Sequence, residues 1–366
     1  MSVAPAPGAA PVRAEDAFDV ERAATWIREN ASDTAGLGTT PEVTQFVGGA
    51  SNLTYLLRYE GGPDAGGRDL VLRRPPSGTK AKGAHDMRRE HDLQAALAPS
   101  FPLVPTMVGY CGDDGVIGSE FYVMDRVVGT ILRRDVPDDL GLDRDSVNRL
   151  CRNAVDTLVT LHEVELNASG LGALDRGDGY VRRQVEGWAT RYRRARTPDV
   201  GDFEATMAWL DAHQPADLPH VLVHNDFRFD NLVLAPGDPT RVVGVLDWEL
   251  ATVGDPLMDL GSALAYWVQA DDDAPSLAIR LQPTHAPGMM TRAEVVEHYL
   301  RARSLDVTPG QWRFYEVFGA FRLAGIAQQI HYRFHHGQTT NPAYGAFGDV
   351  VRILDARCTR LIAGAP

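Results

Sequence analysis

The hydrophobic pattern of this 366-residue chain changes its period near Gly129, and this change limits the folds open to it. From Val43 to residue 127, short apolar runs alternate with Gly-Gly and Pro-Pro breaks, which is typical of strands joined by turns. After Gly129, apolar residues recur every three or four positions, as they do on one face of a helix. Strands followed by helices predict an α+β fold with two lobes.

The same patterns place the individual elements. Helices are predicted over 18–30, 85–97, 147–161, 180–196 and 203–213, and strands within 43–72, 106–110, 120–127 and 221–247. The expected division is a disordered Ala/Pro-rich tail at 1–16, an N-terminal lobe at 17–127 and a C-terminal lobe at 128–366.

Composition narrows the class of protein. The chain has 36 basic and 49 acidic side chains, a net charge of −13, which argues against a nucleic-acid-binding surface. No apolar run approaches the ~20 residues of a membrane span, and the N-terminus lacks the apolar core of a signal peptide. The three cysteines are widely spaced, as expected in a reducing compartment. These features predict a cytoplasmic protein with no membrane or nucleic-acid partner.

The segment HNDFRFDN at 224–231, followed by VVGVLDWE, carries the clearest chemical signal. It holds Asp226, an amide side chain at Asn231 and a third oxygen donor, Asp247, at the end of an apolar strand. Phosphoryl transfer needs one carboxylate near the acceptor hydroxyl and further oxygen ligands for magnesium. Asp and Asn in loops usually only form turns. Here the preceding histidine, the flanking strands and the later aspartate agree, which favours the catalytic interpretation.

These motifs resemble the aminoglycoside phosphotransferase-like kinases, which share the protein kinase-like fold. The resemblance extends from about Val43 onwards and includes GGASNLTY, VLRRPP, RREHDLQAAL, FYVMDRVVG, HNDFRFDN and VLDWELATVGDPLMDLG. Within this family, the chain resembles more specifically the branch that some eukaryotes carry fused to an acyl-CoA dehydrogenase. The resemblance implies a bilobal, ATP-dependent (or other NTP-dependent) and Mg²⁺-dependent kinase that phosphorylates a small-molecule hydroxyl.

The resemblance also implies a role for each matching residue. Asp226 is then the catalytic base, Asn231 and Asp247 are magnesium ligands, and Asp255 and Asp259 hold the catalytic loop, which His224 braces. Glu249 could face either the site or solvent. The residues expected to bind the nucleotide are Gly48, Gly49, Ser51 and Asn52 over the phosphates, Arg73 and Glu90 from the third strand and its helix, and Asp125 and Val127 near adenine.

The third strand departs from many relatives, which have a lysine there. Here the position is occupied by Arg73, and the chain's two lysines lie beyond a Pro-Pro break. Glu90 lies on an otherwise apolar helix face and needs a cationic partner, because a buried unpaired charge is costly. Arg73 is the expected partner. Arg74 is the alternative, because successive strand residues point to opposite faces.

The acceptor is less constrained. Six arginines lie on the predicted helix at 180–196; they form either a solvated face or the border of an anionic acceptor site, such as that for a hydroxy acid or hydroxyacyl thioester. The stretch 321–337 could line the opposite wall. Its histidines His331, His335 and His336 show i, i+4 spacing, but no third ligand stands out to predict zinc. An antibiotic phosphotransferase and a nucleotide-binding pseudokinase remain as alternative functions. A homodimer is a further possibility for the assembly.

Overall fold

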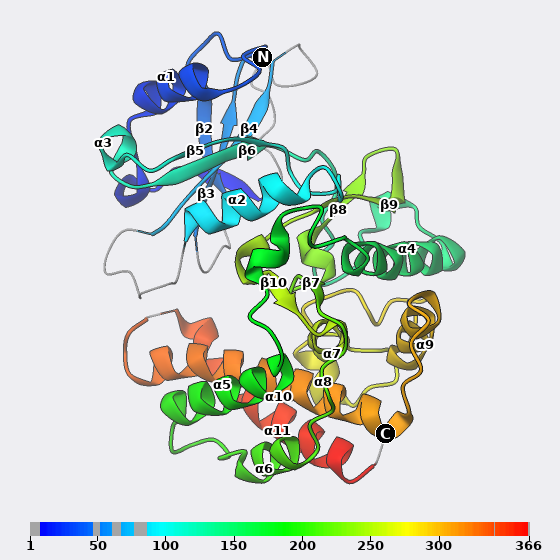
Figure 1. Ribbon diagram of the computed structural model, residues 1–366. Helices are drawn as coiled ribbons and strands as arrows, with labels where there is room; N and C mark the ends of the chain where they lie inside the picture. The colour runs from blue at the N-terminus through cyan, green and yellow to red at the C-terminus, as the bar shows by residue number, and fades with distance from the viewer. Residues whose placement is uncertain (1–7, 47–51, 61–66, 77–85, 340, 365–366) are drawn as a thin grey trace. The chain divides into compact units, whose positions relative to one another are not determined.

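The computed structural model describes residues 8–46, 52–60, 67–76, 86–339 and 341–364 (Figure 1). The chain forms two compact units. The first contains residues 1–128 and 244–249, and the second contains residues 129–243 and 250–366. The expected boundary after residue 127 did not anticipate that the short segment 244–249 packs with the first unit.

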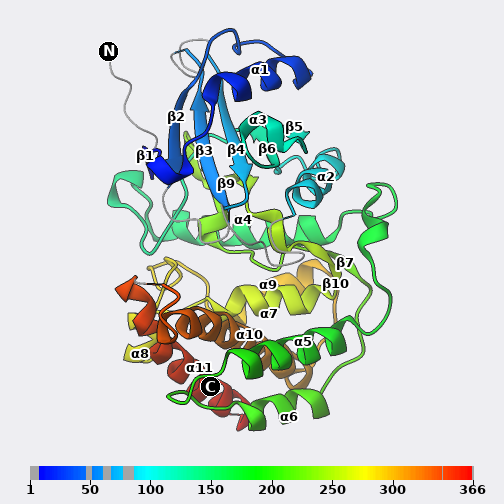
Figure 2. The same cartoon turned by 90° about the vertical axis from the view of Figure 1, so that its left-hand side faces the viewer.

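The first unit is built on a six-stranded antiparallel sheet with strand order β1-β2-β3-β4-β6-β5 (Figure 2). Its strands are β1 (Ala9–Pro11), β2 (Glu42–Phe46), β3 (Leu53–Arg58), β4 (Asp69–Arg74), β5 (Met107–Cys111) and β6 (Phe121–Asp125). Its helices are η1 (Ala14–Asp16), α1 (Val20–Asn30), α2 (Met87–Leu97) and α3 (Asp114–Ile117).

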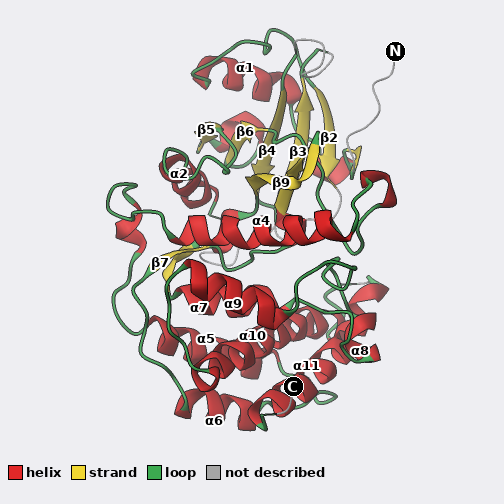
Figure 3. Cartoon of the chain, turned by 90° about the vertical axis from the view of Figure 1, so that its right-hand side faces the viewer, coloured by secondary structure: helices red, strands yellow, loops and turns green. Residues whose placement is uncertain are grey.

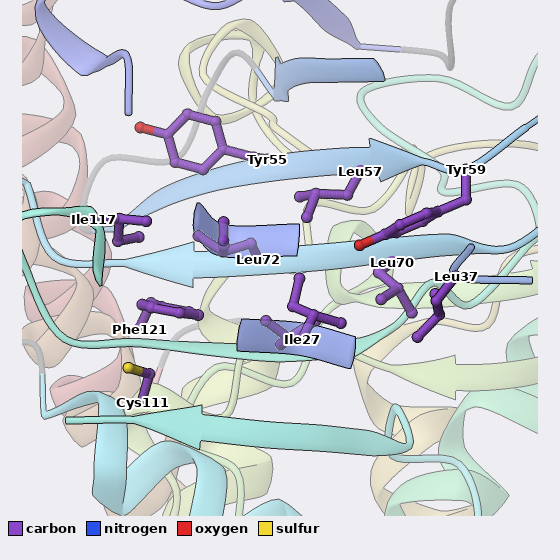
Figure 4. Packing of buried hydrophobic residues seen from close by; sticks show 12 residues of the cluster. Ile27, Leu37, Tyr55, Leu57, Tyr59, Leu70, Leu72, Cys111, Ile117 and Phe121 are labelled. Atoms are coloured by element: carbon purple, nitrogen blue, oxygen red, sulfur yellow. The ribbon is translucent and has the colours of Figure 1, made fainter. Parts of the chain in front are cut away.

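Alternation along β4 divides the sheet residues between two packing layers. Leu70 and Leu72 pack with Ile27 of α1 in the larger apolar cluster, which Figure 4 shows. Val71 points to the other face and packs with Met87 of α2. Because strand residues alternate between faces, Arg73 lies on the α2 side and the next residue lies on the α1 side.

The expected disordered tail is wrong for residues 9–16. Strand β1 pairs with β2, placing Ala9 opposite Phe46. Asp16 is buried, and its carboxylate accepts a hydrogen bond from Gln45 Nε2 at 2.9 Å. The Ala/Pro composition of this segment has a low β-strand propensity and therefore did not predict an edge strand. The strand is stabilised by its pairing with β2.

The second unit is mainly helical (Figure 3). Its helices are η3 (Asp138–Leu140), α4 (Arg144–His162), η4 (Leu171–Leu174), α5 (Tyr180–Ala195), α6 (Glu204–Ala212), η5 (Phe229–Asn231), α7 (Pro256–Ala265), α8 (Ala274–Ala278), α9 (Arg292–Ala302), α10 (Pro309–His335), η7 (Pro342–Ala346) and α11 (Phe347–Ile362). Two short strand pairs, the antiparallel β7 (Val221–Val223) with β10 (Thr252–Gly254), and β8 (Leu232–Ala235) with β9 (Asp238–Val245), flank the segment at 224–231. The end of β9 and most of η6 (Trp248–Leu250) belong to the first unit.

Helix α10 is the central element of the second unit and packs against α5, α6, α7 and α11. Its contact with α7 requires glycine on both helices. A Cβ at Gly319 would lie 2.1 Å from the carbonyl oxygen of Gly261, and a Cβ at Gly261 would lie 2.5 Å from that of Tyr315. The close crossing therefore fixes α7, whose first turn supports the functional loop described below.

The three cysteines, Cys111, Cys151 and Cys358, are free and buried. Among the described residues, no helix combines the length and apolar character needed to cross a bilayer.

Candidate functional site

The loop at 224–226 in the second unit is held by one buried carboxylate. The loop follows the buried strand β7, and the carboxylate belongs to Asp259 in the first turn of α7. The backbone amides of His224 and Asn225 donate to the two oxygens of Asp259, at 2.7 and 2.8 Å. His162 of α4 contacts the same carboxylate through Nε2 at 3.1 Å. Asp259 thus accepts three hydrogen bonds with no solvent exposure.

The surroundings of Asp259 keep it ionised. Burial alone raises the pKa of this carboxyl group, but the hydrogen bond from His162 and the nearby histidines and backbone amide outweigh burial and lower the pKa below its usual value. Asp255 plays a related part as the N-cap of α7, because its carboxylate accepts from the amides of Leu257 and Met258. Its other oxygen accepts from the Leu218 amide at 2.9 Å. Asp259 thus contacts the loop as expected, whereas the hydrogen bonds of Asp255 go to the first turn of α7 and to Leu218.

Asn225 is held in a left-handed backbone conformation with φ +63°. Such a conformation in a residue other than glycine persists where surrounding contacts determine it. Its side-chain Nδ2 donates to the Leu250 carbonyl at 3.1 Å, and its own carbonyl accepts from Arg322 Nη2 at 2.6 Å. Together with the Asp259 contact, these bonds fix the backbone immediately before Asp226.

Asp226 and Asn231 are brought together within this loop. Asn231 Nδ2 donates to the Asp226 carbonyl at 2.8 Å and to Asp226 Oδ2 at 2.9 Å. Arg228 Nε also contacts Oδ2, at 3.2 Å. The described residues give no hydrogen bond to Oδ1 of either Asp226 or Asn231, so one oxygen of each remains for a ligand. His224 Nδ1 accepts from the Asp226 amide at 3.2 Å, and this contact braces the loop. His224 itself is fully buried.

The first unit contains a buried ion pair between β4 and α2. Arg73 Nη1 donates to Glu90 Oε1, and Tyr122 of β6 donates its hydroxyl to the same oxygen at 2.8 Å. Glu90 is 1% exposed. The alternative pairing is wrong, because Arg74 points to the other face and donates to the Asp16 carbonyl at 2.6 Å. The alternation of β4 explains the difference.

Asp247 also belongs to the first unit and meets the same arginine. Arg73 Nη2 lies 3.4 Å from Asp247 Oδ1. The Asp247 backbone is left-handed, with φ +67°, and its side chain is 35% exposed. Asp247 is thus a partly exposed carboxylate held by a buried cation. Glu249 accepts from Asn52 Nδ2 at 3.3 Å, so its side chain is directed at the segment expected to cover phosphates.

The other residues expected to bind the nucleotide have mixed surroundings. Gly48, Gly49 and Ser51 lie outside the described residues. The carboxylate of Asp125 is paired with Arg68 at 2.7 and 3.0 Å, and its amide donates to the Thr106 carbonyl. In the described ranges, the backbone of Val127 makes no hydrogen bond, so its amide and carbonyl are available to a ligand.

Sequence reasoning missed two positioning residues. His162 follows the helix predicted over 147–161 and had no assigned role, although its ring joins Asp259 to the Tyr299 hydroxyl, 2.6 Å from Nδ1. Arg322 supports the Asn225 carbonyl from a stretch of apolar residues on α10. A single arginine within such a stretch was the available signal, because buried charge is rare unless it has a partner.

A sheet-rich unit with a buried strand-to-helix ion pair, followed by a helical unit carrying a clamped His-Asn-Asp loop, defines the protein kinase-like class of fold. Residues 42–305 match the model of the phosphotransferase enzyme family. A Ralstonia eutropha crystal structure, provisionally described as an aminoglycoside phosphotransferase, is 30% identical and superposes with a TM-score of 0.79 over 96% of this chain and 100% of that one. The chain belongs to the phosphotransferase enzyme family.

Curated relatives extend the comparison. Acyl-CoA dehydrogenase family member 10 of Mus musculus is 36% identical over 82% of this chain but 27% of its own length. Family member 11 of Pongo abelii is 32% identical over 92% of this chain and 42% of its own length. The chain therefore spans less than half of these relatives. Choline kinase from Cryptosporidium parvum, 11% identical, has a TM-score of 0.60 over 94% of this chain and 96% of its own, a likeness of fold alone.

Proposed function

We propose that this phosphotransferase is a small-molecule kinase that transfers the γ-phosphate of ATP to an acceptor hydroxyl, with Mg²⁺ as the metal. The observation that carries the proposal is the position of Asp226. One of its oxygens is fixed by Asn231 and Arg228, and the other has no hydrogen-bond partner among the described residues. A carboxylate oriented in this way can accept the proton of a hydroxyl as that hydroxyl attacks phosphorus.

The donor set suits magnesium. Asn231 uses its amide nitrogen for Asp226 and leaves its oxygen, and Asp247 offers a partly exposed carboxylate. Both are hard oxygen donors, the type that Mg²⁺ prefers. When bound, the ion would neutralise charge on the nucleotide phosphates. We assign Asn231 and Asp247 to the metal, and Arg73 to the phosphates beside it.

Arginine can replace the usual lysine because its planar guanidinium has several N–H donors, which can bind different partners at the same time. Nη1 is used by Glu90, and Nη2 is directed at Asp247. A guanidinium can bind phosphate oxygens through several donors at once. The nucleotide is assigned further to Gly48, Gly49, Ser51 and Asn52, and to the backbone near Asp125 and Val127, as the family resemblance implies.

Charges near the loop favour an anionic acceptor, such as a hydroxy acid or a hydroxyacyl thioester. Arg322, which holds Asn225, lies 5.3 Å from the ring centre of Trp188 on α5, and Arg191 lies 4.9 Å from the same ring. The tryptophan therefore has two guanidinium groups over its ring, one exposed and one joined to the catalytic loop. Of the other helix arginines, Arg193 is already paired with Glu204. The similarity of this chain to relatives named as acyl-CoA dehydrogenase family members supports the same acceptor class.

A second candidate acceptor is an aminoglycoside or macrolide antibiotic. The 30% identity to the Ralstonia eutropha protein favours it. Such amine-bearing, cationic acceptors favour carboxylates around the attacking hydroxyl, which the Arg191–Trp188–Arg322 arrangement does not supply.

The test is nucleotide consumption with Mg²⁺ against a panel of hydroxy acids, hydroxyacyl thioesters, aminoglycosides and macrolides, using ATP and GTP in parallel. Mass spectrometry then identifies the phosphorylated product. We expect one anionic class to raise turnover well above hydrolysis in water. Turnover with antibiotics alone would overturn the anionic acceptor, and nucleotide binding without turnover on any acceptor would indicate a pseudokinase.

A further inference from the structure

A cluster of metal-binding residue types lies in the second unit, formed by side chains to which the proposed kinase chemistry gives no role. His331 and His335 are one helical turn apart near the end of α10, and Asp199 lies in the loop after α5. The ligand atoms of all three side chains lie within 4.8 Å of one another. His331 Nε2 is 2.9 Å from Asp199 Oδ2, and His335 Nδ1 is 3.9 Å from Asp199 Oδ1.

These distances between side-chain atoms are close to the distances between the ligand atoms around a bound metal ion. Tetrahedral zinc with bonds of about 2.0–2.1 Å places its ligand atoms roughly 3.3 Å apart. His335 and Asp199 are 39% and 45% exposed, so small side-chain rotations can supply the remaining adjustment. A partly open cluster also leaves room for water as a further ligand.

The cluster is supported by its surroundings. His331 is 6% exposed, and its ring is packed against Gly348, where a Cβ would lie 2.9 Å from Cε1. Within the described residues, its ring has no hydrogen-bond partner except Asp199, and Nδ1 is buried without one. The Asp199 carbonyl accepts from Arg352 at 3.1 Å, which fixes the loop backbone. The ring of His331 is therefore committed to this cluster.

We propose that Asp199, His331 and His335 bind one divalent transition-metal ion of the zinc type. Two imidazole nitrogens and one carboxylate oxygen form a donor set that suits Zn²⁺, Co²⁺ or Ni²⁺ and not the all-oxygen preference of Mg²⁺ or Ca²⁺. The bound ion joins the loop after α5 to the end of α10. It is separate from the proposed nucleotide metal and does not depend on the proposed kinase activity.

The ionisation of Asp199 agrees with this role. A hydrogen bond from Thr197, followed by that from His331, lowers the pKa of Asp199 to about 2. The carboxylate is therefore charged at neutral pH and loses no proton when a metal binds.

The experiment measures Zn²⁺ binding to the full chain, without an affinity tag, by equilibrium dialysis, with Co²⁺ absorption reporting coordination. The test variants are Asp199→Asn and His335→Gln, both at exposed positions. The matched control is His336→Gln, an exposed neighbour outside the cluster. We expect one Zn²⁺ per chain and a Tm that rises with Zn²⁺. Each test variant should weaken binding at least tenfold, and the control should bind as the wild type does.

Three results would overturn the proposal. The first is no binding by the wild-type protein at a large excess of Zn²⁺. The second is wild-type affinity in both test variants, and the third is equal weakening in His336→Gln. Each would show that Asp199, His331 and His335 do not form a metal site.

Discussion

Replacing Asp259 by Asn tests the support of the functional loop. The carboxylate accepts from the amides of His224 and Asn225 and contacts His162, with no solvent exposure. An asparagine keeps one acceptor oxygen and presents an NH₂ group in place of the other. At least one backbone amide of the loop then faces a donor, and the remaining acceptor oxygen no longer carries negative charge.

The expected loss of stability follows from these contacts. Hydrogen bonds to a charged group contribute about 1.5–3 kcal/mol each, and removing one member of a buried charged group costs about 3–5 kcal/mol. We therefore expect Asp259→Asn to lower the free energy of unfolding by about 3–5 kcal/mol, with a lower urea midpoint and an unchanged m-value.

The pH dependence should change as well. Because the folded state lowers the pKa of Asp259, its contribution is fully present above the ordinary aspartate pKa of about 3.9 and is lost as the pH falls through the folded value. Asp259→Asn should flatten this acid limb. The control is Asp143→Asn, an exposed N-cap that accepts one amide hydrogen bond, where asparagine caps equally well. A loss below about 1 kcal/mol in Asp259→Asn would refute the reasoning, since that is the value of one ordinary hydrogen bond.

Two further predictions concern packing and the acceptor. Gly319→Ala places a Cβ 2.1 Å from the Gly261 carbonyl and should separate α7 from α10, at a cost of about 1–3 kcal/mol measured by thermal unfolding; the control Gly310→Ala has open space at its Cβ and should keep the wild-type Tm. Arg191→Glu should raise KM for an anionic acceptor several-fold and leave KM for the nucleotide unchanged, whereas Arg194→Glu, exposed on the same helix, should affect neither. Equal effects of the two charge reversals would contradict the role given to Arg191.

Much of the fold follows from local sequence pattern. The change of hydrophobic period at Gly129 separates the sheet-rich and helical units, and helix α5 begins at the predicted Tyr180. Strand alternation also explains why Arg73, and not Arg74, meets Glu90. Periodicity is a local property, so it determines elements and faces well.

Long-range contacts were harder to predict. Strand β1 forms only by pairing with β2, and the short segment 244–249 packs against Phe101 through Trp248, with ring centres 6.1 Å apart. Likewise, Asp199 lies 132 positions from His331, so spacing along the chain gave no sign of the third side chain in that cluster. Contacts of this kind depend on tertiary packing, which overrides local propensity.

The most direct measurement of the central claim compares acceptor phosphorylation by the wild-type protein and by Asp226→Ala under identical Mg²⁺ and ATP. The control is Asp238→Ala, an exposed aspartate at the start of β9. We expect Asp226→Ala to reduce kcat by at least a hundredfold, the usual contribution of a positioned proton acceptor, while ATP affinity stays near that of the wild type. Full activity in Asp226→Ala would contradict the account.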